Sequence, residues 1–157
     1  MKQSEEAVAV EGSGIRAISV GDFMTRDLVT LNESDDLALA EKMLRLGGIR
    51  HLPVVHNRKL VGLVTQRDLL RSAIDRDAKT TTASDIMTRQ PVTASPATSL
   101  VQAARTMLSN KYGCLPVCES DGTLVGIITE ADFVRFAADV VQDLDLVAEA
   151  VSGPNRA

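Results

Sequence analysis

Two stretches of seven residues, 62–68 (GLVTQRD) and 126–132 (GIITEAD), share one pattern of residue types. In each, a glycine and two apolar residues are followed by Thr-x-x-Asp. A short apolar run predicts a strand, and Thr-x-x-Asp predicts the first turn of a helix. Each stretch therefore predicts a strand that passes directly into a helix, and the second occurrence indicates an internal repeat.

The repeat extends through most of the chain. Asp85 lies 63 positions after Asp22, and the same offset relates three pairs of motifs: 22–25 (DFMT) with 85–88 (DIMT), Val29 and Thr30 with Val92 and Thr93, and 52–54 (LPV) with 115–117 (LPV). The seven-residue stretches lie 64 positions apart, so the second repeat holds one additional residue. We place this residue in the turn at 119–123, because Asp-Gly predicts a hairpin and hairpin loops tolerate insertions.

Both repeats predict the same order of elements, β-α-β-β-α. An amphipathic helix follows a short strand, two strands then form a hairpin, and a second helix begins after Thr65 or Thr129. The predicted strands are 28–31, 52–55 and 60–64 in the first repeat and 92–94, 115–118 and 124–128 in the second, and the predicted first helices are 35–46 and 98–110. The fold class is therefore α+β with small mixed sheets, and two such small units should share a core.

The same reading divides the chain into a flexible lead (1–19), a first repeat (20–74), a linker (75–82), a second repeat (83–135) and a C-terminal extension and tail (136–157). Residues 130–151 contain no proline or glycine and repeat apolar residues at helical spacing, so they predict one long helix ended by Gly153 and Pro154. The apolar face of this helix needs a partner. That partner is either the rest of the same chain or a second copy, and we expect a homodimer.

Composition excludes several classes of protein. The net charge is −4, which argues against nucleic-acid binding, and no apolar run approaches the length of a membrane span or forms a secretory signal, so we expect a cytoplasmic protein. The only two cysteines, Cys114 and Cys118, would lie too far apart on one strand to share a metal ion. No nucleophile-elbow or Walker pattern occurs, so we expect neither a metal site nor an enzyme.

The ordered set of motifs, found twice, resembles the CBS domain, and the pair resembles the tandem arrangement called a Bateman module. The resemblance covers 20–71 and 83–135. It implies a disc-like, often dimeric module that holds AMP, ADP, ATP or S-adenosylmethionine between its repeats, as a ligand rather than a cofactor, and regulates a partner. Because no catalytic or membrane domain accompanies the pair, we expect a free-standing module acting on a separate, unidentified protein. The alternative is an interaction module that binds no nucleotide.

The resemblance also implies where a ligand would bind. It assigns ribose binding to Asp68 and Asp132, while the hydroxyls of Thr65 and Thr129 would reach phosphate or ribose at a helix N-terminus. The competing interpretation is a capping box, in which these side chains satisfy the helix's own N–H groups. Spacing alone favours the cap, and the complete repeat favours ribose binding.

Phosphate and adenine contacts complete the candidate site. The resemblance places phosphate contacts at Arg50 and His51, and Arg67 is a further candidate that could equally be a solvated helix residue. The second repeat has glycine and cysteine where the first has Arg50 and His51, so the two clefts should be unequal. The predicted adenine pocket comprises six residues that could instead pack in the core, together with a proline that also suits the start of a strand: Val29, Thr30, Val92, Thr93, Ile49, Tyr112 and Pro53.

Overall fold

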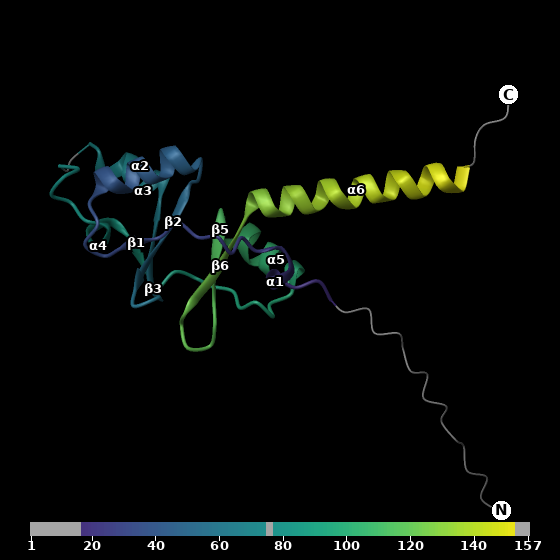
Figure 1. The fold of residues 1–157 in the computed structure, drawn as a ribbon, viewed down its shortest axis with the longest axis horizontal. Coiled ribbons are helices and arrows are strands. Elements are labelled where there is room, and N and C mark those ends of the chain that lie inside the picture. The colour runs from purple at the N-terminus through teal and green to yellow at the C-terminus, as the bar shows by residue number, and fades with distance from the viewer. Residues whose placement is uncertain (1–16, 75–76, 153–157) are drawn as a thin grey trace, which may run out of the picture.

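The computed structural model describes residues 17–74 and 77–152, and in 149–152 it describes the backbone alone. The first part of the chain forms α1 (Val20–Phe23), β1 (Leu31–Asn32), α2 (Leu37–Gly47), β2 (His51–His56), β3 (Lys59–Thr65) and α3 (Gln66–Ser72). The second part forms α4 (Ala83–Ile86), β4 (Thr88–Arg89), α5 (Leu100–Asn110), β5 (Cys114–Cys118), β6 (Leu124–Thr129) and α6 (Glu130–Ser152). The predicted α+β class with small sheets and a long C-terminal helix is confirmed (Figure 1).

The sheets are small and mixed. Strands β1, β2, β3 and β4 form one sheet in that order, with β1 parallel to β2 and the other pairs antiparallel, and β5 pairs with β6 in a second sheet. The predicted first strands were too long. Only Leu31 and Asn32 pair as β1, and in the second repeat Ala94 makes a single parallel bridge to Val117. The residues just before Leu31 and just before Ala94 pair with no other strand, because these segments connect one repeat to the other.

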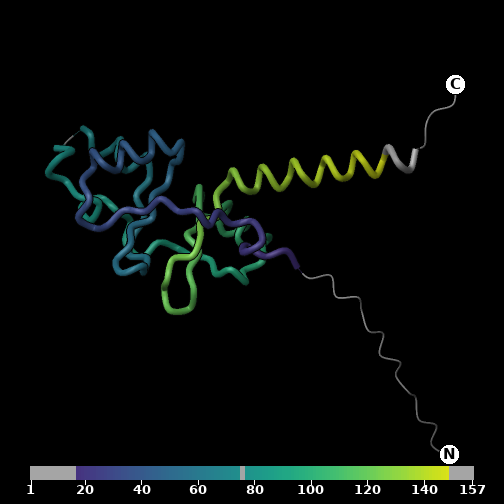
Figure 2. Tube along the Cα trace, viewed as in Figure 1, coloured from purple at the N-terminus to yellow at the C-terminus, as the bar shows by residue number. Residues whose placement is uncertain are grey.

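The two repeats exchange their N-terminal segments. Helix α4 and strand β4 belong to the second repeat in sequence, yet Ala83 and Met87 pack in the core of the first repeat and β4 pairs with β3. Reciprocally, Val20 and Met24 pack in the core formed by α5, β5 and β6. Figure 2 shows the chain beginning beside the second repeat and crossing to the first. Each core is therefore complete only when both repeats are folded.

The exchanged segments begin with short helices that the sequence reading missed. Each has a capping box, in which the aspartate accepts from the backbone N–H three residues earlier: Ser19 N to Asp22 Oδ2 at 2.9 Å and Thr82 N to Asp85 Oδ2 at 2.8 Å. The capping pattern was visible, but four residues are too few to show an apolar period.

Two glycines make room for the exchanged methionines. A methyl group added to Gly126 would lie 2.5 Å from Met24 Sδ, and one added to Gly62 would overlap Met87 Sδ and lie 2.8 Å from Met87 Cγ. The space beside these two glycines is filled by methionine side chains rather than by a ligand. Glycine is required at each position because the thioether of an exchanged methionine packs directly against the strand backbone there.

Pro53 has a structural position inside a strand rather than a place in the predicted pocket. It is fully buried in β2, and β2 lies between β1 and β3 rather than at an edge. Strand β1 pairs only with Val54 and Val55, so the proline nitrogen, which has no hydrogen to donate, lies beyond the paired stretch.

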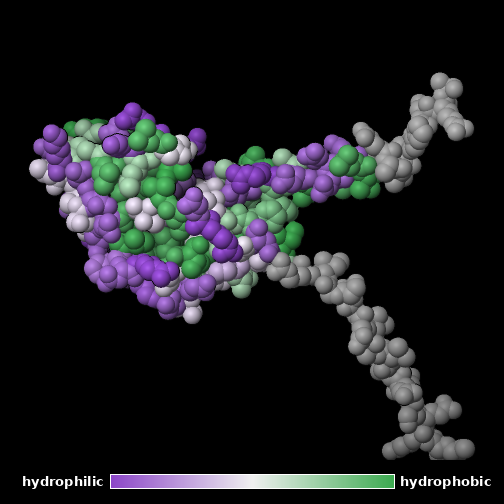
Figure 3. All heavy atoms as spheres, in the orientation of Figure 1, coloured by the Kyte–Doolittle hydropathy of each residue, from purple (hydrophilic) through white to green (hydrophobic). Residues whose placement is uncertain are grey.

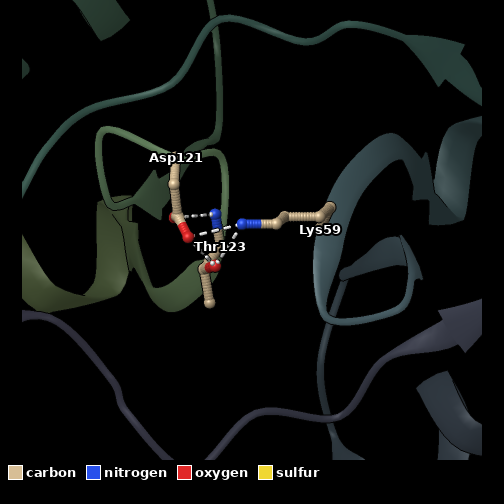
Figure 4. Close-up of polar contacts among 3 residues, drawn as sticks. All are labelled: Lys59, Asp121 and Thr123. Carbon is tan, nitrogen blue, oxygen red and sulfur yellow. Dashed lines mark hydrogen bonds and ion pairs between the residues drawn. The ribbon is translucent and has the colours of Figure 1, made fainter.

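The tips of the two hairpins meet at the end of the strands opposite to α3 and α6. Lys59 Nζ forms an ion pair with Asp121 and donates to Thr123 Oγ1 at 2.8 Å (Figure 4). These contacts hold the pKa of the Asp121 carboxyl well below its usual range. Backbone bonds from Leu60 N to Gly122 O (3.2 Å) and from Leu124 N to Arg58 O (3.0 Å) join the same two turns. The hairpin tips therefore form a second contact between the repeats.

Helix α6 extends beyond the module. Its predicted span is confirmed to within one residue at the C-terminus, and the predicted stop at Gly153 and Pro154 lies outside the described residues. Phe136 still contacts the body of the module through Phe23, with ring centroids 4.9 Å apart. Every residue from Ala137 to Ala148 is exposed, so this part of the helix does not fold back on its own module (Figures 1 and 3).

The glycine–methionine contact predicts a specific loss of stability. We expect Gly62→Ala to lower the free energy of unfolding by about 1–3 kcal/mol, because the new methyl group overlaps Met87 in a packed core. Urea unfolding of Gly62→Ala, Met87→Ala and the double variant measures the coupling between the two sites. If the two losses simply add, the clash is not the reason for the glycine.

Candidate functional site

A cleft of about 710 Å³ lies between the repeats. Its walls come from the start of β2, the junction of β3 with α3, the segment that follows α4, the turn before β5 and the first residue of α6: Arg50, His51, Leu63, Thr65, Gln66, Arg67, Asp68, Leu70, Arg71, Thr88, Gln90, Pro91, Val92, Lys111, Tyr112, Gly113, Cys114 and Glu130. Because both repeats supply walls, the cleft exists only in the assembled pair.

Asp68 caps helix α3 with one carboxylate oxygen. Its Oδ2 accepts from Thr65 N at 2.8 Å and from Thr65 Oγ1 at 2.7 Å, and Thr65 Oγ1 in turn accepts from Asp68 N. Among the described residues, Asp68 Oδ1 has no hydrogen-bond partner, and the residue is only partly buried at the wall of the cleft. The cap and a ligand contact are therefore compatible, because each can use a different oxygen.

Asp132, the counterpart of Asp68, has a different environment. Its Oδ2 accepts from Thr129 N and Thr129 Oγ1, at 2.8 and 2.9 Å, and its Oδ1 accepts from Arg135 at 3.1 Å. The aspartate is 3% exposed. Because the carboxylate is buried and its Oδ1 is already paired with Arg135, a ligand would have to compete with that ion pair for Asp132.

Four cations face the cleft beside Asp68: Arg50, Arg67, Arg71 and Lys111. Only two acidic residues, Asp68 and Glu130, share its wall. The corresponding positions around Asp132 are Gly113 in place of Arg50, Ala131 in place of Arg67 and Gly48 in place of Lys111, and only Arg71 has a cationic counterpart, Arg135. The Asp68 cleft thus carries a positive balance that its counterpart lacks, and this balance favours an anionic ligand.

Lys111 has an unusual backbone for its residue type. It ends α5 in the left-handed region with φ of 57°, the same position that Gly48 occupies at the end of α2 with φ of 59°. Gly48 is thus the C-cap of α2. A lysine in that conformation costs stability relative to glycine, and it places an ammonium group at the cleft.

His51 lies at the base of this positive wall. Burial lowers its pKa below 6.5, Glu130 opposes that shift and Arg50 adds to it. A methyl group on Gly113 would lie 2.9 Å from His51 Nε2, so the glycine gives the imidazole its space. The neutral ring is the favoured form near pH 7, and protonation would add a further positive charge to the cleft.

The described residues show little that would support covalent chemistry. Burial and the nearby Glu130 raise the pKa of the Cys114 thiol to about 12, so it stays protonated and is a poor nucleophile. Within 17–74 and 77–152, no group of three or more potential metal-binding side chains occurs. No helix in that part of the chain is long and apolar enough to cross a membrane.

The structure brings half of the predicted site residues into one cleft: Thr65, Arg67, Asp68, Arg50, His51, Val92 and Tyr112. The remaining seven do not line it: Val29, Thr30, Thr93, Ile49, Pro53, Thr129 and Asp132. Ile49 instead lines a groove between α2 and α3, and Pro53 is fully buried in its sheet. The predicted adenine pocket combined residues of both repeats, whereas in the structure only Val92 and Tyr112 of that set line the cleft beside Asp68.

Sequence reasoning missed Arg71, Gln90 and Glu130. Arg71 lies four residues after Arg67, so one helix face presents both, and this spacing could have revealed it. Gln90 and Glu130 reach the cleft from the other repeat. No local sequence pattern predicts that these two residues lie in the cleft.

Tandem β-α-β-β-α units with exchanged segments and a cleft between them define a paired ligand-binding module. The model of the CBS domain matches residues 20–75 and 83–139, and the chain belongs to the CBS domain family.

Two solved structures with this fold are complexes with adenosine compounds. CBSX2 from Arabidopsis thaliana in complex with AMP is 34% identical, with a TM-score of 0.72 over 78% of this chain and 98% of that chain. The CBS domain pair of protein MJ0100, in complex with 5-methylthioadenosine and S-adenosyl-L-methionine, is 27% identical, with the same TM-score and coverage.

Several curated relatives are longer proteins. An inosine-5'-monophosphate dehydrogenase of Korarchaeum cryptofilum is 36% identical over 110 residues, which are 70% of this chain and 22% of the enzyme. The chain spans less than half the length of the first curated relatives that it matches.

The lowered pKa of His51 predicts how stability depends on pH. Below pH 6.5 the unfolded chain binds a proton at this position more readily than the folded protein, so stability falls as the pH decreases through this range. We expect the free energy of unfolding, measured in urea between about pH 7.5 and pH 5.5, to fall less in His51→Gln than in the wild type. The His56→Gln variant is the control, and an unchanged slope in His51→Gln would contradict the assignment.

Proposed function

We propose that this chain is a non-catalytic regulatory module that binds an adenosine-containing ligand, most tightly ADP or ATP, in the cleft beside Asp68. The observation that carries the proposal is the free Oδ1 of Asp68 at the wall of a cleft that also presents four cations. The AMP complex of CBSX2, which has the same fold, supports the class of ligand.

The ribose is the first part of the ligand. A carboxylate can accept hydrogen bonds from both hydroxyls of a cis-diol, and Asp68 is already oriented by its bonds to Thr65. Because the cap holds Oδ2 in place, Oδ1 needs no rearrangement before it binds. This preorganisation lowers the entropic cost of binding.

The phosphates are the second part. Arg50, Arg67, Arg71 and Lys111 come from both sides of the cleft, so a chain of phosphates could contact both repeats at once. The same cations disfavour S-adenosylmethionine, whose sulfonium centre is positive. Charge therefore favours ADP and ATP over S-adenosylmethionine, which remains the alternative adenosine ligand.

The adenine ring is the third part. Leu63, Val92 and Tyr112 supply apolar and aromatic surface to the cleft. Val92 is 47% exposed and Tyr112 is 36% exposed, so both present surface that a ligand in the cleft can contact. A flat ring placed between them would bury both.

Signalling follows from where the cleft lies. A ligand that contacts both repeats favours the arrangement in which they are closest, and the hairpin contact through Lys59 and Asp121 at the far end of the strands can serve as the pivot. We propose that the module acts as a homodimer on a separate protein. The competing candidate, an interaction module without a ligand, is favoured only around Asp132, where the carboxylate is buried and paired.

The two aspartates give a matched test of ligand binding. We expect Asp68→Asn to weaken ADP and ATP binding at least about 10-fold, because hydrogen bonds to a charged acceptor contribute about 1.5–3 kcal/mol each. Asp132→Asn should leave the affinity within about 2-fold, since both of its oxygens are already bonded within the protein. Isothermal titration calorimetry of nucleotide-stripped protein measures both, with thermal unfolding as the check that each variant is folded. Equal losses of affinity in the two variants would indicate that Thr-x-x-Asp serves only as a helix cap.

The cations predict an order of ligands. We expect affinity to increase from AMP to ADP and ATP, to be weakest for S-adenosylmethionine, and to decrease as salt is added. Arg71→Gln should weaken ATP binding about fivefold and leave adenosine binding unchanged, whereas Arg105→Gln, at an exposed position on α5, should change neither. Calorimetry at two salt concentrations tests this order. Tighter binding of S-adenosylmethionine than of ATP would contradict it.

A further inference from the structure

Two pairs of equivalent residues, one member of each pair from either repeat, line the cleft. His51 is the first residue of β2 as Cys114 is of β5, and Gln66 is the first residue of α3 as Glu130 is of α6. In both repeats the N–H of that first helix residue donates to the carbonyl just before the strand, at 3.0 and 3.1 Å. The backbone is therefore the same on both sides, and all four side chains reach the cleft.

Only one diagonal of this arrangement can change its charge near neutral pH. Gln66 is uncharged, and the pKa of the Cys114 thiol is raised to about 12. The other two residues are an imidazole from the first repeat and a carboxylate from the second. A methyl group on Gly113 would lie 2.9 Å from His51 Nε2 and 4.0 Å from Glu130 Oε2, so both groups lie against the same glycine. The junction of the repeats thus holds one titratable pair.

The ring nitrogens of His51 are open to the cleft. Neither has a hydrogen-bond partner among the residues that the structure describes, and in that part of the chain no fully buried side-chain nitrogen is left unpaired. A neutral imidazole offers one N–H and an imidazolium offers two, whereas an ionised phosphate oxygen can only accept. A phosphate beside His51 therefore favours the protonated ring, which adds a second donor and a positive charge.

The other charges in the cleft decide which form of the ring the free protein holds. The segment after α4 supplies only uncharged residues to the wall. The titratable and charged side chains that share the wall with His51 are Arg50 beside β2, Arg67, Asp68 and Arg71 from α3, Lys111, Tyr112 and Cys114 from the end of α5 to the start of β5, and Glu130 from α6. The four cations outnumber the two carboxylates and oppose protonation, as burial does. Phosphates would reverse this balance, because they neutralise the cations.

We propose that His51 is a proton-dependent phosphate contact, neutral in the free protein near pH 7, which takes up a proton from solvent when the phosphates of an adenine nucleotide enter the cleft. Glu130, from the other repeat, stabilises the imidazolium that forms. The inference rests on the proposed function for its ligand and adds the protonation state in which the ligand is held. Because the complex binds more protons than the free protein, affinity decreases as the pH rises.

Nuclear magnetic resonance tests the proton directly, because the chain has only two histidines. The signals of full-length, nucleotide-stripped protein are assigned with His51→Gln and His56→Gln and followed over pH. We expect saturating ADP to raise the pKa of His51. His56 lies at the other end of β2 beside Glu33, so its titration curve should not respond to ADP. Adenosine, which has no phosphate, should bind without raising the pKa of His51.

Calorimetry measures the consequence for affinity. Between pH 6 and pH 8 we expect wild-type protein to lose about five- to tenfold more ADP affinity than His51→Gln, since one nearby opposite charge shifts a pKa by an amount of this order. The comparison is needed because the phosphate itself titrates near pH 6 and contributes equally to both proteins. Glu130→Gln should move the loss of affinity to lower pH, because it removes the carboxylate that favours the imidazolium.

The outcomes separate this inference from the proposed function. ADP that saturates the protein without raising the pKa of His51 would overturn the inference and leave the ligand assignment standing. An equal rise with adenosine would also overturn it, because the phosphates would then not be the cause. A pH dependence that is the same in wild type and His51→Gln would assign the proton to another group. Absence of ADP binding at every pH would refute the proposed function itself.

Discussion

The exchange of N-terminal segments between the repeats is the constraint on which the rest of the structure depends. Met24 and Met87 each cross into the core of the other repeat, and Gly126 and Gly62 leave the space that their thioethers need. Neither repeat can complete its hydrophobic core alone. The exchange also carries Gln90, Pro91 and Val92 to the wall of the cleft beside Asp68, so the packing that joins the repeats is the same packing that forms the cleft.

The two repeats contain related aspartate sites that differ in their surroundings. The capping geometry of Asp68 and Asp132 is nearly identical, with all of the distances to Oδ2 between 2.7 and 2.9 Å. The difference comes from the neighbours: Arg135 occupies the second oxygen of Asp132, whereas cations surround Asp68 without closing on it. A motif shared by both repeats can therefore serve mainly the helix in one and a ligand in the other. Lys111 accepts a left-handed backbone that suits glycine, which is a local cost in stability at the wall of the cleft.

Helix α3 lies between two concave surfaces. One side of this seven-residue helix faces the cleft, and the other faces the groove between α2 and α3. The hairpin contact through Lys59 and Asp121 joins the two repeats at the other end of the strands. The repeats are therefore connected both by the exchanged segments and by the tips of their hairpins.

The repeat, the order of elements, the length of α6 and the Thr-x-x-Asp caps could all be predicted from the sequence, because each depends on residues that are close together in the chain. The spacing of apolar residues over a short stretch predicts a helix or a strand, and a repeated motif indicates the duplication. The exchange, the true role of Gly62 and the presence of Glu130 in the cleft could not be predicted, because each depends on a contact between residues more than twenty positions apart. The sequence predicted unequal clefts from Arg50 and His51, but it could not show the different environments of the Asp68 and Asp132 carboxylates. Their local patterns are equivalent, and the free oxygen that distinguishes them is a property of the folded surroundings.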